Sequence, residues 1–224
     1  MGLQDDDSDW YRSSTWNESV AAAFETKLRR ARATSRPQYV RIQGVHLIAQ
    51  EDAATRQAGR ELLQRVIDEY EEDELQSVWA AENLADALTA DDLVEDAEAL
   101  TRALIARRDR DPSGWRGGRT DLDLALAEIL LSRGDADSLR EADERLDQSG
   151  EEVQRASMFR NLVLRHLVAR ARVASGLGDR ERAAHYAHDA LEVAAETTPS
   201  LPRHPDLGRP DPDDDLISEL RKLS

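Results

Sequence analysis

The feature that most limits the fold of this chain is a long interval with almost no proline. Between Pro37 and Pro199 only Pro112 interrupts, whereas five of the seven prolines lie within residues 199–212. Inside the interval, Ala and Leu recur at spacings of three and four residues, which is the period of an amphipathic α-helix. Because proline is excluded from helix interiors, the pattern predicts an all-α protein made of stacked helices.

The apolar periodicity also predicts where the helices lie. The expected spans are about 15–36, 38–50, 53–70, 75–88, 94–108, 122–132, 138–150, 151–175, 179–196 and 213–223. Three of these starts carry capping boxes, in which Thr, Asp or Ser precedes Glu by three residues: Thr15/Glu18, Asp92/Glu95 and Ser138/Glu141. Gly150 is predicted to end the helix that begins at 138, because glycine often terminates helices.

Composition shifts along the chain suggest three regions. Residues 1–14 form an acidic N-terminal segment that we expect to be partly disordered, and residues 15–198 form a helical repeat domain. Residues 199–224 form a proline-rich linker and a short C-terminal helix, with the linker either leading to that helix or wrapping the last repeat. Within the helical domain, the loop 109–121 holds three of the eleven glycines and marks the clearest break.

A degenerate repeat is detectable, most clearly in residues 178–191, where Gly-Asp precedes Ala183, Ala187 and Ala190. This stretch resembles the second helix of a tetratricopeptide repeat, in which small residues let two helices approach closely. Residues 9–43 (with Asp-Trp-Tyr-Arg, Thr-Trp-Asn and Gln-Tyr-Val-Arg-Ile-Gln) resemble the opening of a group of uncharacterised bacterial tetratricopeptide-like proteins. The resemblance implies a shared entry helix and a right-handed array of antiparallel helix pairs, and it carries over no catalytic activity. Spacings of about 39 to 45 residues exceed the usual period, so a HEAT-like array is an alternative.

Aromatic residues are concentrated at the N-terminus. Half of the ten aromatic side chains occur within the first 39 residues, at positions 10, 11, 16, 24 and 39. We expect them to anchor the first helix as a cap over the first helix pair; an aromatic patch that binds a peptide is the alternative.

Charge and composition exclude several classes of function. The formal net charge is −16, and residues 37–112 alone carry 18 acidic and 8 basic side chains. So acidic a chain is a poor ligand for duplex nucleic acid. The absence of cysteine removes disulfides and thiolate chemistry. No apolar run is long enough to span a membrane, and the acidic N-terminus is unlike a signal peptide, so we expect a soluble, cytoplasmic protein.

Motifs of catalysis are missing. The sequence has no dinucleotide or phosphate-binding glycine loop, no zinc-protease motif and no nucleophile elbow. His185 and His188 are three residues apart on one expected helix, but no third metal ligand is fixed by the sequence. We therefore expect no enzyme activity, no cofactor and no metal.

A tetratricopeptide-like array would line its concave groove with the first helix of each pair. A mixed apolar and charged groove of this kind suits a peptide or a partner helix. On the register above, the residues expected to bind a partner are Val40, Gln43, Leu47, Trp79, Glu82, Asp86, Arg165, Val168 and Arg172.

Three functional hypotheses follow. The first is a non-enzymatic scaffold or adaptor that binds another protein on its concave face. The second, motivated by the net charge, is an antitoxin, immunity or inhibitor protein that neutralises a basic partner. The third is a metal-dependent all-helical enzyme that uses the histidines.

Overall fold

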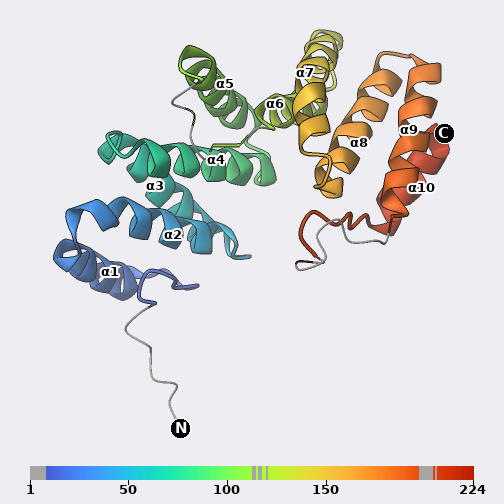
Figure 1. Ribbon diagram of the computed structural model, residues 1–224. Coiled ribbons are helices and arrows are strands. Elements are labelled where there is room, and N and C mark those ends of the chain that lie inside the picture. Colours follow the sequence, from blue (N-terminus) through green and yellow to red (C-terminus); the bar gives the residue numbers. More distant parts are fainter. Residues whose placement is uncertain (1–8, 113–114, 116–117, 120, 197–203, 205) are drawn as a thin grey trace. The chain divides into compact units, whose positions relative to one another are not determined.

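The computed structural model describes residues 9–112, 115, 118–119, 121–196, 204 and 206–224 (Figure 1). Across these residues the regular structure consists of α-helices and one 3-10 turn, with no strand. The expectation of an all-α protein is therefore confirmed. In the same ranges, no helix combines the length and apolar character needed to cross a bilayer. Residues 1–8 of the expected acidic segment, and residues 199–203 and 205 of the expected linker, lie outside the described residues.

The chain divides into two compact units. Unit 1 is Met1–Gly118 and unit 2 is Arg119–Ser224. The division lies inside the glycine-containing loop that the sequence marks as the clearest break.

The described residues of unit 1 form five α-helices and one 3-10 turn. In chain order they are α1 (Glu18–Arg30), the 3-10 turn η1 (Ala33–Ser35), α2 (Arg36–Ile48), α3 (Ala53–Glu69), α4 (Glu74–Ala90) and α5 (Val94–Arg110). Each of the pairs α2/α3 and α4/α5 packs together, α3 contacts α4, and α2 contacts α4 as well (Figure 1). The second helix of one pair thus packs on the first helix of the next.

The core of unit 1 continues from helix to helix and is extended by the N-terminal aromatic residues. Phe24 is 2% exposed and packs with buried aliphatic side chains of α2, α3 and α4. Trp10 lies 5.3 Å from Phe24 and 5.1 Å from Tyr39 between ring centroids, and Tyr11 lies 4.6 Å from Tyr39. Trp16 also contacts Phe24. The expectation that these side chains anchor α1 on the first helix pair is confirmed.

The α2/α3 pair is held unusually close by two glycines. A Cβ atom added at Gly59 would lie 2.7 Å from the Ile48 nitrogen and 2.8 Å from the Gly44 carbonyl oxygen. Both neighbours are backbone atoms, which cannot rotate away, so the crossing requires a residue without a side chain at position 59.

Where the structure describes it, unit 2 repeats this order of packing with five helices. They are α6 (Leu122–Arg133), α7 (Ala136–Arg155), α8 (Arg160–Gly176), α9 (Arg180–Ala194) and α10 (Asp214–Leu223). α6 packs on α7 and α8 on α9, while α7 and α6 both contact α8, and α10 follows on α9 and α8. Ala183, Ala187 and Ala190 are at most 3% exposed, which confirms their predicted role as packing positions.

Several helix starts differ from the capping-box prediction. α1 begins one residue after Asn17, whose side chain accepts a hydrogen bond from the Val20 nitrogen at 3.0 Å, so Thr15 is not the cap. α7 begins after Asp135, which accepts from the nitrogens of residues 137 and 138. Asp92 has a positive φ of 59° and ends a turn without capping α5. In α1 and α7 the cap is the residue at which the chain leaves extended geometry, whereas Leu93 before α5 makes no side-chain cap hydrogen bond. Spacing to a later Glu therefore does not identify the cap.

Gly150 does not end a helix, contrary to the sequence prediction. α7 continues through it to Arg155, and the turn before α8 occupies residues 156–159. The buried stripe Leu139, Ala142, Leu146, Ser149 and Val153 keeps its helical spacing across this position. Burial of that stripe outweighs the modest helix penalty of one glycine, which is on the order of 1 kcal/mol.

Candidate binding groove

Three of the residues predicted to bind a partner belong to the core of unit 1. Val40, Gln43 and Leu47 are each 0% exposed, so they offer no surface to a partner and the prediction is wrong for them. The N-terminal segment covers this face of α2. The Gln43 amide donates to the Ser13 carbonyl oxygen at 2.7 Å, and its oxygen accepts from the Ser13 nitrogen at 3.0 Å.

The predicted residues of α4 are only partly accessible. Glu82 is buried, Trp79 is half-buried and Asp86 is exposed. The guanidinium carbon of Arg41 lies 5.0 Å from the centre of the Trp79 ring, and Arg41 also donates to the Gln76 side chain at 2.7 Å. Burial lowers the pKa of Arg41. These contacts make the α4 face mainly a packing surface of unit 1, and burial removes Glu82 from a partner-binding role.

The remaining three predicted residues, Arg165, Val168 and Arg172, come together in unit 2. They line one open groove of about 660 Å³, formed by α6, α8, α10 and the segment before α10. Its other lining residues are Glu128, Leu131, Asn161, Leu164, Ala169, Asp211, Pro212, Asp213, Asp215, Leu216 and Glu219. Leu131, Leu164, Val168, Ala169 and Leu216 give it an apolar floor, while the charged groups lie around them.

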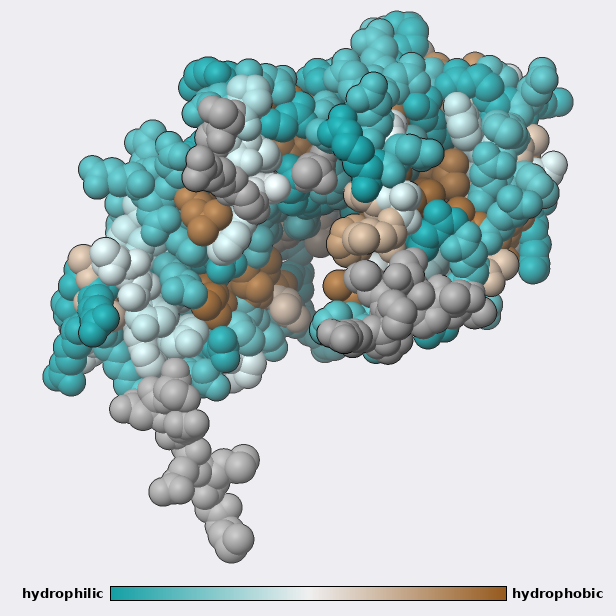
Figure 2. Space-filling view, viewed as in Figure 1, coloured by the Kyte–Doolittle hydropathy of each residue, from teal (hydrophilic) through white to brown (hydrophobic). Residues whose placement is uncertain are grey.

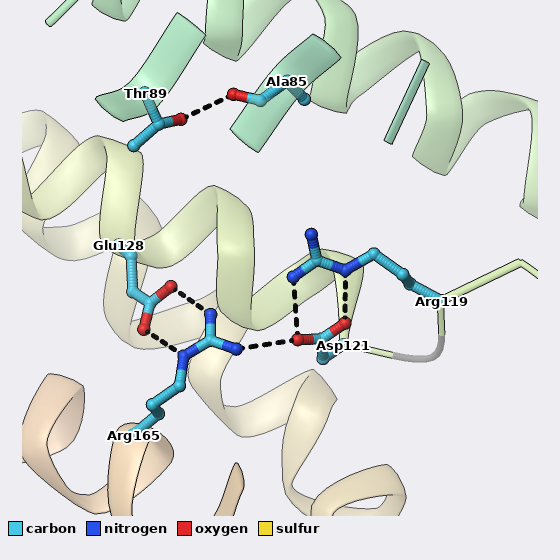
Figure 3. A network of polar contacts seen from close by, with 6 residues as sticks. All are labelled: Ala85, Thr89, Arg119, Asp121, Glu128 and Arg165. Atoms are coloured by element: carbon cyan, nitrogen blue, oxygen red, sulfur yellow. Dashed lines mark hydrogen bonds and ion pairs between the residues drawn. The ribbon is translucent and has the colours of Figure 1, made fainter. Parts of the chain in front are cut away.

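Arg165 is held by two carboxylates (Figure 3). Its guanidinium donates to both oxygens of Glu128, at 3.2 and 2.6 Å, and to Asp121 at 3.1 Å, while Arg119 binds the same Asp121 at 2.7 and 2.9 Å. Burial alone would lower the pKa of Arg165, but its bonds to Glu128 and the two nearby carboxylate charges raise it. Arg165 is thus a fixed, already neutralised cation in the groove wall.

Arg172, which is also on α8, is neutralised in the same way by a carboxylate of α10. It donates to both carboxylate oxygens of Glu219 on α10, each at 2.7 Å. This hydrogen bonding raises the pKa of Arg172 and lowers the pKa of Glu219. The pair fastens α10 to α8, and Leu220, which is fully buried, anchors the same helix by apolar contact.

The segment before α10 forms one wall of the groove, and we call residues 206–213 the strap. The Asn161 nitrogen, at the start of α8, donates to the Gly208 carbonyl oxygen at 2.8 Å. Gly208 has a φ of 72° and lies directly against the Phe159 backbone. Asp213 closes the strap by accepting from the Leu216 nitrogen at 2.7 Å, which caps α10.

Sequence reasoning missed the strap and α10 as parts of the groove. The available signal was the pattern of residues 213–223, in which Leu216, Leu220 and Leu223 lie on one face behind an Asp cap. That pattern indicates a helix that packs by one face, but it does not say on which helices it packs.

The histidines considered as metal ligands each face a carboxylate one turn along α9. His185 Nε2 lies 3.5 Å from Asp189, and His188 Nε2 lies 3.5 Å from Glu192. In the part of the chain that the structure describes, no group of three or more His, Asp or Glu side chains is arranged to hold a metal ion.

Most of the visible surface is hydrophilic, and apolar residues appear on it as small separate patches (Figure 2). Comparison with known proteins adds no identification: no protein family model matches this chain, and no curated protein or solved structure matches it either. The function is therefore inferred from the groove itself.

Proposed function

We propose that this chain is a non-enzymatic protein-binding scaffold whose helix pairs form right-handed, tetratricopeptide-like arrays. The packing order supports this proposal, because in each unit the second helix of one pair contacts the first helix of the next and the first helices contact each other. Short stacked pairs of this type bury their apolar faces against neighbours and leave one face for a ligand.

The observation that carries the proposal is the groove of unit 2. Its volume of about 660 Å³ and its apolar floor, bordered by fixed charges, match what a protein segment needs for burial and orientation. Arg165 and Arg172 are already paired with carboxylates, so they stiffen the walls and do not provide reactive groups.

Site-specific photo-crosslinking tests the proposal. A photoreactive amino acid at Asn161, which is exposed and lines the groove, should give a recurrent protein adduct in cells. The same group at Glu144, exposed on α7 and outside the groove, is the control. The captured protein, once purified, should bind the parent chain and bind Asn161→Trp at least tenfold more weakly. No adduct at Asn161, or the same adducts at both positions, would contradict the proposal.

A second candidate function is an inhibitor that covers a basic partner. The net charge of −16 favours it, since a strongly acidic surface steers cationic proteins and speeds their association. Co-expression with each neighbouring gene product distinguishes it from an adaptor: an inhibitor restores growth to cells that express a toxic partner, whereas an adaptor does not.

A further inference from the structure

The charged residues that line the groove of unit 2 indicate which kind of protein segment it binds. We propose that the groove of unit 2 binds a basic protein segment that carries Lys or Arg next to apolar side chains. This inference rests on the proposed function and names the class of partner for the same site.

The first step is the charge balance of the lining. Two basic residues, Arg165 and Arg172, face five acidic ones, Glu128, Asp211, Asp213, Asp215 and Glu219, so the lining carries a net charge of −3 (2 − 5). The two arginines are engaged by Glu128 and Glu219 in two-point contacts. The excess negative charge therefore belongs to Asp211, Asp213 and Asp215, which we call the acidic rim.

No residue of the acidic rim forms an ion pair in the described part of unit 2, although the charge of Asp213 acts on Arg172 and helps to raise its pKa. Asp211 and Asp215 are exposed and form no ion pair there, and Asp213 uses its carboxylate to cap α10. Such a rim repels acidic ligands and favours basic ones. The apolar floor lets a ligand bury apolar side chains, which adds binding free energy that the charges do not provide. Both features together fit a basic segment with apolar side chains.

The apolar surface extends beyond one end of the groove. Met158 and Leu207 are 49% and 52% exposed, and both flank the contact in which the strap meets the start of α8. Asn161, which lines the groove, donates its backbone N–H to that contact. From Asn161 to Arg172 the α8 surface is roughly 16 Å long, which accommodates about three turns of a bound helix.

A peptide selection on the purified full chain tests the inference. The probe is a display library of random 12-residue peptides, followed by titration of the selected peptides with a fluorescent label. We expect enrichment of Lys and Arg together with Leu, Ile or Phe, and affinities that weaken as NaCl is raised.

Matched variants show whether the acidic rim is responsible. The double variant Asp211→Asn/Asp215→Asn should weaken binding of the selected peptides about tenfold, because two exposed ion pairs are lost. Glu144→Gln, which removes one charge from α7 outside the groove, should leave binding unchanged. Asp211→Lys/Asp215→Lys should select acidic peptides instead. Far-UV circular dichroism establishes that every variant is folded.

The outcomes separate this inference from the proposed function. If the selected peptides are neutral or acidic but Asn161→Trp still blocks them, the groove binds protein segments and the inference about charge is wrong. If basic peptides bind equally well to Asn161→Trp and to the Asp211→Asn/Asp215→Asn variant, they bind elsewhere and the inference is wrong. If no peptide binds in a manner that depends on Asn161, the proposed function fails as well.

Discussion

Single buried polar side chains decide how the N-terminal segment is attached. Gln43 is fully buried and satisfies both the N–H and the carbonyl of Ser13, as a neighbouring β-strand would. Gln43→Glu keeps the acceptor but removes the donor and buries a charge, so we expect it to lower the free energy of unfolding by about 1–3 kcal/mol at pH 7. Urea unfolding monitored by circular dichroism measures the loss.

The control for Gln43→Glu is Gln38→Glu, which places the same charge on an exposed position of α2. It should change stability by less than about 0.5 kcal/mol. The loss at position 43 should shrink near pH 4.5, where a protonated carboxyl can again donate to Ser13. Equal losses at the two positions would show that the contact with Ser13 contributes nothing.

His166 makes the stability of unit 2 depend on pH. Burial lowers its pKa below the ordinary 6.5, although its hydrogen bond to the Leu146 carbonyl at 3.0 Å and the charge of Asp147 oppose this and Arg170 reinforces it. The unfolded chain therefore binds a proton more readily than the folded chain, and stability falls as the pH drops through 6.5. We expect urea midpoints to decrease between pH 7.5 and 5.5, and to decrease less in His166→Gln; parallel decreases would refute this role.

At the scale of the helix, glycine has opposite effects at two positions. Gly59→Ala would push a methyl group into the backbone of α2, so we expect a loss of about 1–3 kcal/mol. In Gly150→Ala the new Cβ meets nothing within 4 Å and the residue lies inside α7, so a gain of about 0.5–1 kcal/mol is expected. Chemical denaturation measures whether the free energy of unfolding falls in Gly59→Ala and rises in Gly150→Ala. A stabilised Gly59→Ala would mean that α2 and α3 separate easily.

For the whole molecule the dominant long-range force is repulsion among like charges. The chain carries 46 acidic and 30 basic side chains, and its exposed ion pairs each contribute little. Salt therefore screens more repulsion than attraction. Raising NaCl from about 20 to 300 mM should increase the melting temperature by about 2 °C or more. KCl at the same ionic strength should act equally, and a decrease would show that ion pairs outweigh the net charge.

Helix positions were predictable because they depend on local spacing. The span expected at 53–70 is Ala53–Glu69 in the structure, and that at 213–223 is Asp214–Leu223. The prediction failed at Gly150, where a long-range demand for burial of the α7 stripe overrides a local terminator. The prediction of the helix caps was wrong for a related reason. A capping side chain is defined by backbone geometry, which the spacing between two residues does not reveal.

The lining of the groove was predictable only in part. Arg165, Val168 and Arg172 were identified because all three lie on one face of α8, and a helical register is sufficient to group them. Val40, Gln43 and Leu47 share a face of α2 by the same rule, but Ser13 and the N-terminal aromatic side chains cover that helix. Contacts between residues about 30 positions apart carry no periodic signal in the sequence.

The sequence by itself determined that this chain is helical, where most of its helices lie and which of their faces are apolar, because these properties follow from side-chain spacing along one helix. Only the tertiary structure decided which apolar faces remain open. In unit 1 the N-terminal segment closes the face of α2, and in unit 2 the strap and α10 border a groove and leave its floor accessible. The physical reason is that burial is a property of pairs of distant segments, whereas periodicity is a property of one.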